Sequence, residues 1–139
     1  MSYDTLKNGI ANLVKSLGYM ESSQSQDFED APEGQLGSTF ILKCISGEVT
    51  VESGTLIDRF YDRQVWQVLI AFSKSEQNDS IILDDIHRKK DLALLKLDEP
   101  ANWSTFVTVL KYKKWEILEF PNYFVLSIVL DVIDKYIYT

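Results

Sequence analysis

The sequence predicts an α+β domain in which two helices cover one face of a mostly antiparallel, four-stranded sheet. Two segments carry apolar residues at the 3.6-residue period of a helix, and others alternate at the two-residue period of a strand. Their order is helix, strand, strand, helix, strand, strand, which is typical of strands joined by turns with the helices packed on one side. The 139 residues, 45% of them hydrophobic, fit one domain with one core. We therefore expect a single domain over residues 1–139.

The first helix is expected over residues 3–17. Apolar side chains that start at Leu6 recur at i+4, i+7, i+8 and i+11 and form one stripe. Gly18 follows at the position where a left-handed helix stop is common. The next residues, 21–38, are polar and contain Pro32 and two glycines, so they predict a long loop.

Two strands are expected on either side of a second long loop. Residues 39–45 (TFILKCI) predict the first strand, which ends at a Ser-Gly turn. Residues 46–62 mix apolar and polar positions irregularly, so we expect an extended loop there, with a ragged hairpin as the alternative. Residues 63–73 (RQVWQVLIAFS) predict a stronger strand, because every second residue from Trp66 to Phe72 is large and apolar.

The second half of the chain predicts one helix and two further strands. Residues 80–97 form a helix that ends before Pro100, with a buried stripe that begins at Ile82. Residues 105–115 predict a strand. Residues 123–138 fit both a strand face and a helical spacing, and their many β-branched side chains favour a strand. As the last strand of an open sheet, this segment is expected to offer an edge for pairing.

The negative charge is concentrated in one third of the chain. The formal net charge is −7, and residues 21–62 hold all of the excess, since Lys43 and Arg59 are their only bases. Solvated loops explain such a segment, and so does a surface that repels an anion or attracts a basic partner. The overall balance argues against a nucleic-acid or membrane surface built on basic residues.

The residue types that usually carry catalysis stand apart in the sequence. Cys44 is the single cysteine and lies in the middle of an expected strand, so we expect a buried thiol and no internal disulfide. His87 is the only histidine, and its spacing to Asp91 supplies two metal ligands without a third. The paired carboxylates lack an apolar context that would raise a pKa. We expect no enzyme activity, no metal and no cofactor.

Neither a signal peptide nor a membrane span is expected. The first residues lack a basic cap followed by an apolar run. The most apolar stretch, residues 124–133, is interrupted by Ser127 and Asp131 and is too short to span a bilayer. We therefore expect a soluble protein that is intracellular at synthesis and has no membrane partner.

Several local features occur together along nearly the whole chain. A first helix ends at Leu17-Gly18, the strand TFILKCI and a long acidic connection follow, and the lead-in FYDR precedes RQVWQVLIAFS. A helix then ends before Pro100 and Trp103, and the last strand reads YFVLSIVLDV. This order of elements resembles the tail terminator (tail completion) proteins of long-tailed bacteriophages.

The resemblance implies a structural virion protein. Such a protein forms a homohexameric ring at the head-proximal end of the tail, stops polymerisation of the tail tube and forms the head–tail joining surface. Its partners would be further copies of itself, the tail tube protein and the head–tail connector protein. DNA would pass through the ring during ejection without specific binding. The protein would assemble in the host cytoplasm and end in the virion.

Two groups of residues are candidates for this role. Large side chains and arginines in and beside the expected loops are candidates for the subunit interface: Phe28, Leu36, Arg59, Phe60, Tyr61 and Arg63. Acids of the same segments are expected to line the lumen or another ring surface, where they would repel the DNA duplex: Asp27, Glu29, Asp30, Glu48, Glu52 and Asp58.

Two alternatives remain open from the sequence. A small acidic immunity or inhibitor protein that blocks a basic toxin would have the same size, charge and aromatic-acidic segment. Another phage neck or tail component of similar fold fits as well. A native mass measurement would separate a ring from an inhibitor.

Overall fold

The computed structural model describes residues 3–22, 28, 37–52, 58–74 and 78–138. For residues 49–52, 58–61 and 134–138 it describes the backbone. The elements in chain order are α1 (Tyr3–Lys15), β1 (Met20–Glu21), β2 (Thr39–Glu52), β3 (Asp58–Ser73), α2 (Asp79–Asp98), the 3₁₀ turn η1 (Pro100–Asn102), β4 (Val109–Glu119) and β5 (Tyr123–Tyr138).

The strands form one five-stranded sheet in the order β1-β2-β3-β5-β4. The pair β1–β2 is parallel, and all other pairs are antiparallel. The expected α+β class with two helices is confirmed. The described strands form the expected mostly antiparallel sheet, but the expected number of four strands was wrong, because β1 adds a short parallel strand beside the start of β2. Two residues are too few to produce a period in the sequence.

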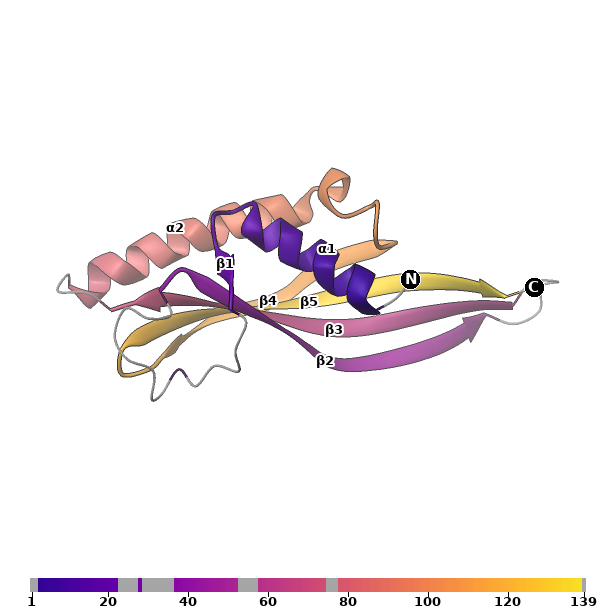
Figure 1. Ribbon diagram of the computed structural model, residues 1–139, viewed down its shortest axis with the longest axis horizontal. Coiled ribbons are helices and arrows are strands. Elements are labelled where there is room, and N and C mark those ends of the chain that lie inside the picture. The colour runs from indigo at the N-terminus through magenta and orange to yellow at the C-terminus, as the bar shows by residue number, and fades with distance from the viewer. Residues whose placement is uncertain (1–2, 23–27, 29–36, 53–57, 75–77, 139) are drawn as a thin grey trace.

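Both helices pack on the same face of the sheet, as expected (Figure 1). One cluster of buried residues joins Leu6 and Ile10 of α1, Ile86 of α2, and Trp66 and Leu126 of the sheet. Helix α1 ends at Lys15, and Gly18 follows with a φ of 101°, a left-handed conformation that glycine adopts without strain. A second, smaller cluster lies on the opposite face and contains Phe28, Leu69, Ala71, Tyr123 and Val125.

Most of the long loop expected at residues 46–62 is instead antiparallel strand, which agrees with the hairpin that the sequence left open as the alternative. Strand β2 continues to Glu52 and pairs with β3 as far as the pair Glu52–Arg59. The register shifts between Cys44 and Ser46, so a bulge interrupts the alternation of side chains. Strand β3 is also paired along its other edge with β5. The β3–β5 pairing joins segments that are far apart in the chain, and it supplies backbone hydrogen bonds that the local sequence does not signal.

The last strand is confirmed, but it is not an edge of the sheet. Strand β5 lies between β3 and β4, and its residues 123–130 are all buried. A strand covered on both faces carries a nearly continuous apolar run, which explains why two periods fit this segment. Strand β4 begins at Val109, later than expected, because the preceding turn places Trp103 and Val107 in the core. The Trp103 indole Nε1 donates to the Leu97 carbonyl at 2.9 Å.

Three strands continue beyond the helices and form an extension that we call the arm (Figure 1). The arm consists of residues 48–52 of β2, 58–63 of β3 and 133–138 of β5. Strands β3 and β5 stay paired to its tip, where Asp58 lies opposite Tyr138. Strand β4 begins opposite Ile133 and therefore leaves the rest of β5 paired only with β3 among the described residues.

Candidate functional surfaces

The candidate interface residues fall in two places. Arg59, Phe60 and Tyr61 lie on β3 within the arm, next to Arg63. Arg63 is exposed, and its Nε atom lies 3.4 Å from the Asp131 Oδ1 atom of β5. That oxygen is buried and accepts no hydrogen bond of good geometry from the described residues, so the arginine supplies charge without full hydrogen bonding.

Phe28 lies away from the arm, at the other end of the sheet. Its side chain is 9% exposed, and its ring centroid lies 5.6 Å from that of Phe120. It therefore packs against its own subunit, on the sheet face that the helices leave open. Leu36, the remaining candidate for the interface, lies outside the described residues.

The candidate acids are also divided. Glu48 is an exposed residue of β2, Glu52 ends that strand, and Asp58 begins β3. The register places Glu48 opposite Arg63 and Glu52 opposite Arg59. Strands β2 and β3 of the arm therefore pair acidic with basic positions, an arrangement that stabilises antiparallel neighbours. The other candidate acids, Asp27, Glu29 and Asp30, lie outside the described residues.

The sheet offers two long edges. Strand β1 covers β2 only at Thr39 and Phe40, and no described strand pairs with the outer edge of β2 from Ile41 to Glu52. At the other end of the sheet, no described strand pairs with the outer edge of β4. An unpaired edge is a template for a strand from another chain. The sequence predicted that edges would exist, but only the topology shows which strands form them.

Strand β4 carries a basic and aromatic edge. Lys111, Lys113 and Lys114 are exposed, and Tyr112 is 42% exposed. Lysines on an edge strand prevent indiscriminate pairing and leave the edge open to an acidic partner strand. The lysine run is visible in the sequence, but its position on an edge is not.

Trp115 of β4 joins the edge to helix α2. Its ring lies edge-on to the His87 ring at a centroid distance of 5.4 Å, and Lys90 Nζ lies 4.2 Å from its centroid. The second contact has the geometry of a cation–π interaction. His87 is exposed on the helix, and no three possible ligands gather into a metal site anywhere in the part of the chain that the structure describes.

Helix α2 has a second apolar side that the sequence analysis did not single out. Ile81, Leu92 and Leu95 are each more than half exposed. They lie off the buried stripe that includes Ile82 and Ile86. The sequence contained a signal for this second side, because an amphipathic surface helix normally has one apolar stripe and these three apolar residues lie outside it.

Cys44 differs from the expectation, since it is exposed rather than buried. It lies beside the bulge of β2, near the outer edge of the sheet, and its Sγ atom is 3.9 Å from Gln64 Oε1. Partial burial, with the nearby carboxylate of Asp62, raises the pKa of the Cys44 thiol above its ordinary value. A raised pKa reduces the thiolate fraction at neutral pH, which makes this cysteine a slow nucleophile.

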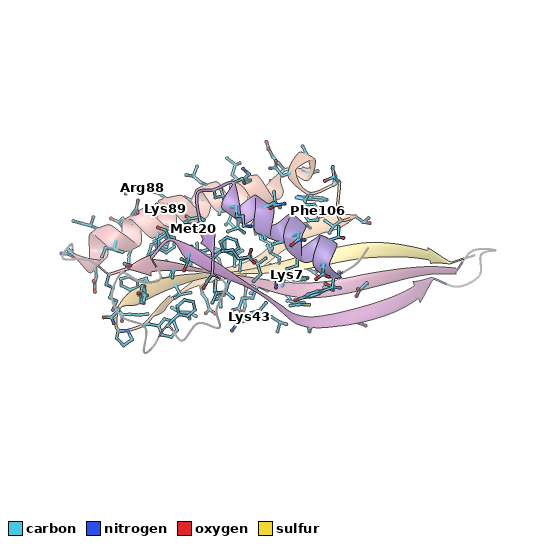
Figure 2. The ribbon with its side chains drawn as sticks, viewed as in Figure 1. Lys7, Met20, Lys43, Arg88, Lys89 and Phe106 are labelled. Carbon is cyan, nitrogen blue, oxygen red and sulfur yellow. The ribbon has the colours of Figure 1, made fainter. Side chains whose placement is uncertain are left out.

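An open pocket of about 620 Å³ lies where the start of α2 meets the end of β3. Asp85, Arg88 and Lys89 contribute its charged side chains, and Arg88 and Lys89 project from the helix in Figure 2. Lys89 Nζ is 2.9 Å from Asp85 Oδ2, so these two charges neutralise one another. Neither Cys44 nor His87 is among its lining residues.

Comparison with models of known protein families gives no match for this chain, and comparison with curated proteins gives none either. Among the described residues, no helix combines the length and the apolar character needed to cross a bilayer.

Proposed function

We propose that this chain is a structural subunit of a long-tailed phage. Copies assemble into a hexameric ring that caps the tail tube, stops its polymerisation and forms the surface that joins the head. The observation that carries this proposal is the arm together with the two long sheet edges that no described strand covers. Unpaired backbone groups and a strand extension without helix cover are features of a chain that completes itself by assembly.

The arrangement of these features also suits a closed ring. The edges of β2 and β4 lie at opposite ends of the sheet and carry different side chains. A contact between two different surfaces is head-to-tail, and it closes into a ring when the rotation between subunits allows.

The acids have a role in the same proposal. The candidate acids of residues 21–62 that lie outside the subunit contact face the lumen or a ring surface and keep the passing duplex from binding. Acidic side chains repel phosphates, whereas lysines and arginines bind them strongly through counterion release. Arg59 and Arg63 lie opposite Glu52 and Glu48, so the repulsion depends on how the arms are placed in the assembled ring.

Native mass spectrometry of the purified full-length chain over a range of protein concentrations tests the proposal. The expected species has a mass near six subunits, and negative-stain images are expected to show rings with a central opening. A monomer at every concentration, with no rings in the presence of tail tubes, would overturn it. The inhibitor alternative predicts that monomer, together with association to a basic protein that is fastest at low salt.

A further inference from the structure

We infer that neighbouring copies join edge to edge, with β4 of one subunit paired antiparallel to β2 of the next. The paired segments are residues 111–118 of β4 and 41–48 of β2, in a register that places Glu116 opposite Lys43 and Lys111 opposite Glu48. This inference rests on the proposed assembly of copies and names the surface through which they meet.

Strand direction supports the pairing. From β2 through β3 and β5 to β4, every neighbouring pair is antiparallel, so β2 and β4 run in opposite directions. When the same sheet is repeated with the helices kept on the same side, β4 of one copy lies beside β2 of the next. The two strands are then antiparallel, which is the pairing used through the rest of the sheet.

The side-chain faces of the two strands also match. Residues directly opposite one another across a ladder share a face of the sheet. Across the sheet, Lys43 of β2 lies opposite Gln67 of β3, which lies opposite Val129 of β5, which lies opposite Lys114 of β4. These four residues face away from the helices. In Figure 2, Lys43 lies on the side of the sheet opposite to α2. By the same steps, Cys44 shares the helix-covered face with Trp66, Leu130 and Tyr112.

Each strand contains one register shift, between Cys44 and Ser46 in β2 and between Tyr112 and Lys114 in β4. In the inferred register the two irregularities lie opposite one another. Each strand has one extra residue there, so matching faces are restored on both sides of the bulge. A slip of one residue would place every side chain opposite one from the other face.

Charge selects among the registers that keep the faces matched. In the unshifted register, each row of directly opposite residues continues from one copy into the same row of the next. This register would place Lys114 of one copy opposite Lys43 of the next, and like charges directly opposite are unfavourable. A shift of two residues removes this clash and forms the two opposite-charge pairs Glu116–Lys43 and Lys111–Glu48. All of these side chains are exposed in the single chain and are free to rearrange.

The shift also covers apolar surface. It places Trp115 beside Cys44, Ile117 beside Leu42 and Leu118 beside Ile41. Tyr112, which is 42% exposed, comes to lie opposite Gly47, where the glycine leaves room for a ring. The pairing begins at Ile41 because β1 already covers β2 at Phe40, where Ser22 N donates to the Phe40 carbonyl at 2.9 Å.

The native cysteine makes the register measurable, because Cys44 is the only cysteine in the chain. In the inferred register, Trp115→Cys puts a second thiol opposite Cys44 of the neighbouring copy, at a spacing that a disulfide can bridge. Mild oxidation of this variant is expected to give a ladder of covalent oligomers on non-reducing gels. The ladder is expected to disappear with reductant and in the Cys44→Ser background.

Tyr112→Cys is the matched control, since Tyr112 shares the face of Cys44 and would lie beside it in the unshifted register. We expect no ladder from this variant. A ladder from Tyr112→Cys alone would overturn the inferred register. Native rings that give no ladder with either variant would place the interface elsewhere, and the proposed function would survive. Absence of any wild-type oligomer would overturn the proposed function itself.

A charge exchange tests the same register without removing Trp115. Lys43→Glu or Glu116→Lys alone is expected to raise the protein concentration for half-assembly at least about fivefold, because each creates a like-charge pair. The double variant restores opposite charges and is expected to return close to the wild-type value. Arg88→Glu, a charge reversal on α2 away from both edges, is the control and is expected to leave assembly unchanged. A double variant no better than the single ones would overturn the pairing.

Discussion

The same three strands form two regions with different sources of order. In the body of the domain, β2, β3 and β5 lie beneath α1 and α2, and Trp66 and Leu126 have no exposed surface. In the arm, these strands continue past the helices, as Figure 1 shows. Burial beneath the helices stabilises the body, whereas the described structure of the arm shows only strand pairing. One sheet thus combines a covered core with exposed strand surface, in the arm and at the open edges, that the proposed assembly would use. Substitutions in the core and in the arm should separate stability from assembly.

The largest effect on stability is expected in the body. Leu126→Ala removes a fully buried side chain near the start of β5 and leaves a cavity between the sheet and the helices. We expect the free energy of unfolding to fall by about 3 kcal/mol, measured by urea denaturation. Leu92→Ala, which truncates a leucine that is 62% exposed, is the control and should change it by less than about 0.5 kcal/mol. Equal losses would contradict the assignment of the core.

A smaller effect is expected where α1 meets the turn before β4. A Cβ atom added at Gly9 would lie 2.6 Å from the Phe106 ring, so the ring would have to move. We expect Gly9→Ala to cost about 1 kcal/mol of unfolding free energy, because overpacking outweighs the gain in helix propensity. Asn12→Ala, at an exposed position of the same helix, is the control for propensity alone. Stabilisation by Gly9→Ala in thermal melts would show that the helix is free to shift.

Substitutions in the arm should change assembly more than the free energy of unfolding, unlike the substitutions in the body. Replacing both Phe60 and Tyr61 with serine is expected to cost less than about 1 kcal/mol of unfolding free energy but to shift the protein from oligomer to monomer, because we expect the arm to form a second contact that the ring needs in addition to the paired edges of β2 and β4. The two residues occupy adjacent positions of β3, between β2 and β5. Far-UV circular dichroism would check the fold and native mass would check the assembly. An unchanged oligomer mass would show that these aromatic residues do not form the interface.

The smallest effect concerns pH and is confined to alkaline solution. Burial, and to a lesser degree the Asp85 carboxylate, raise the pKa of Tyr19 above its ordinary value near 10. The folded chain therefore holds this proton at a pH where the unfolded chain has lost it. The stabilisation is complete below the unfolded pKa and is lost as the pH rises through the folded value.

We expect the wild-type unfolding free energy to fall above about pH 10, and to fall less steeply in Tyr19→Phe. Urea titrations of both proteins at pH 8 and pH 10.5 would measure the difference. An equal decrease in unfolding free energy between the two pH values in both proteins would show that Tyr19 titrates as it does in the unfolded chain.

The sequence predicted the structure best where apolar residues kept one helical or strand period without interruption. The stripe of α1 and the alternating face of β3 from Trp66 to Phe72 both lie in the core as expected. The pattern failed where a bulge or a second covered face disturbed the period. The bulge of β2 made residues 46–52 resemble a loop, and burial on both faces gave β5 a helical spacing beside the strand pattern that was correctly preferred.

The candidate surface was only partly visible in the sequence. Arg63 and Glu48 were selected from loops, and the structure places them opposite one another on paired strands. The lysines of β4 were seen as a short basic run, but nothing local shows that they lie on an edge. An edge is defined by the absence of a neighbouring strand, and that depends on residues far away in the chain.

By itself, the sequence determined the α+β class, the two helices and the most apolar strands, because these follow from side-chain periods within a few turns or strand lengths. Tertiary structure decided the rest. It placed β5 inside the sheet, lengthened β2 and β3 into the arm, exposed Cys44 and left the outer edges of β2 and β4 without a partner among the described strands. The physical reason is that strand pairing joins backbone groups from distant segments, and the side chains of any one segment carry little information about which strand will lie beside it.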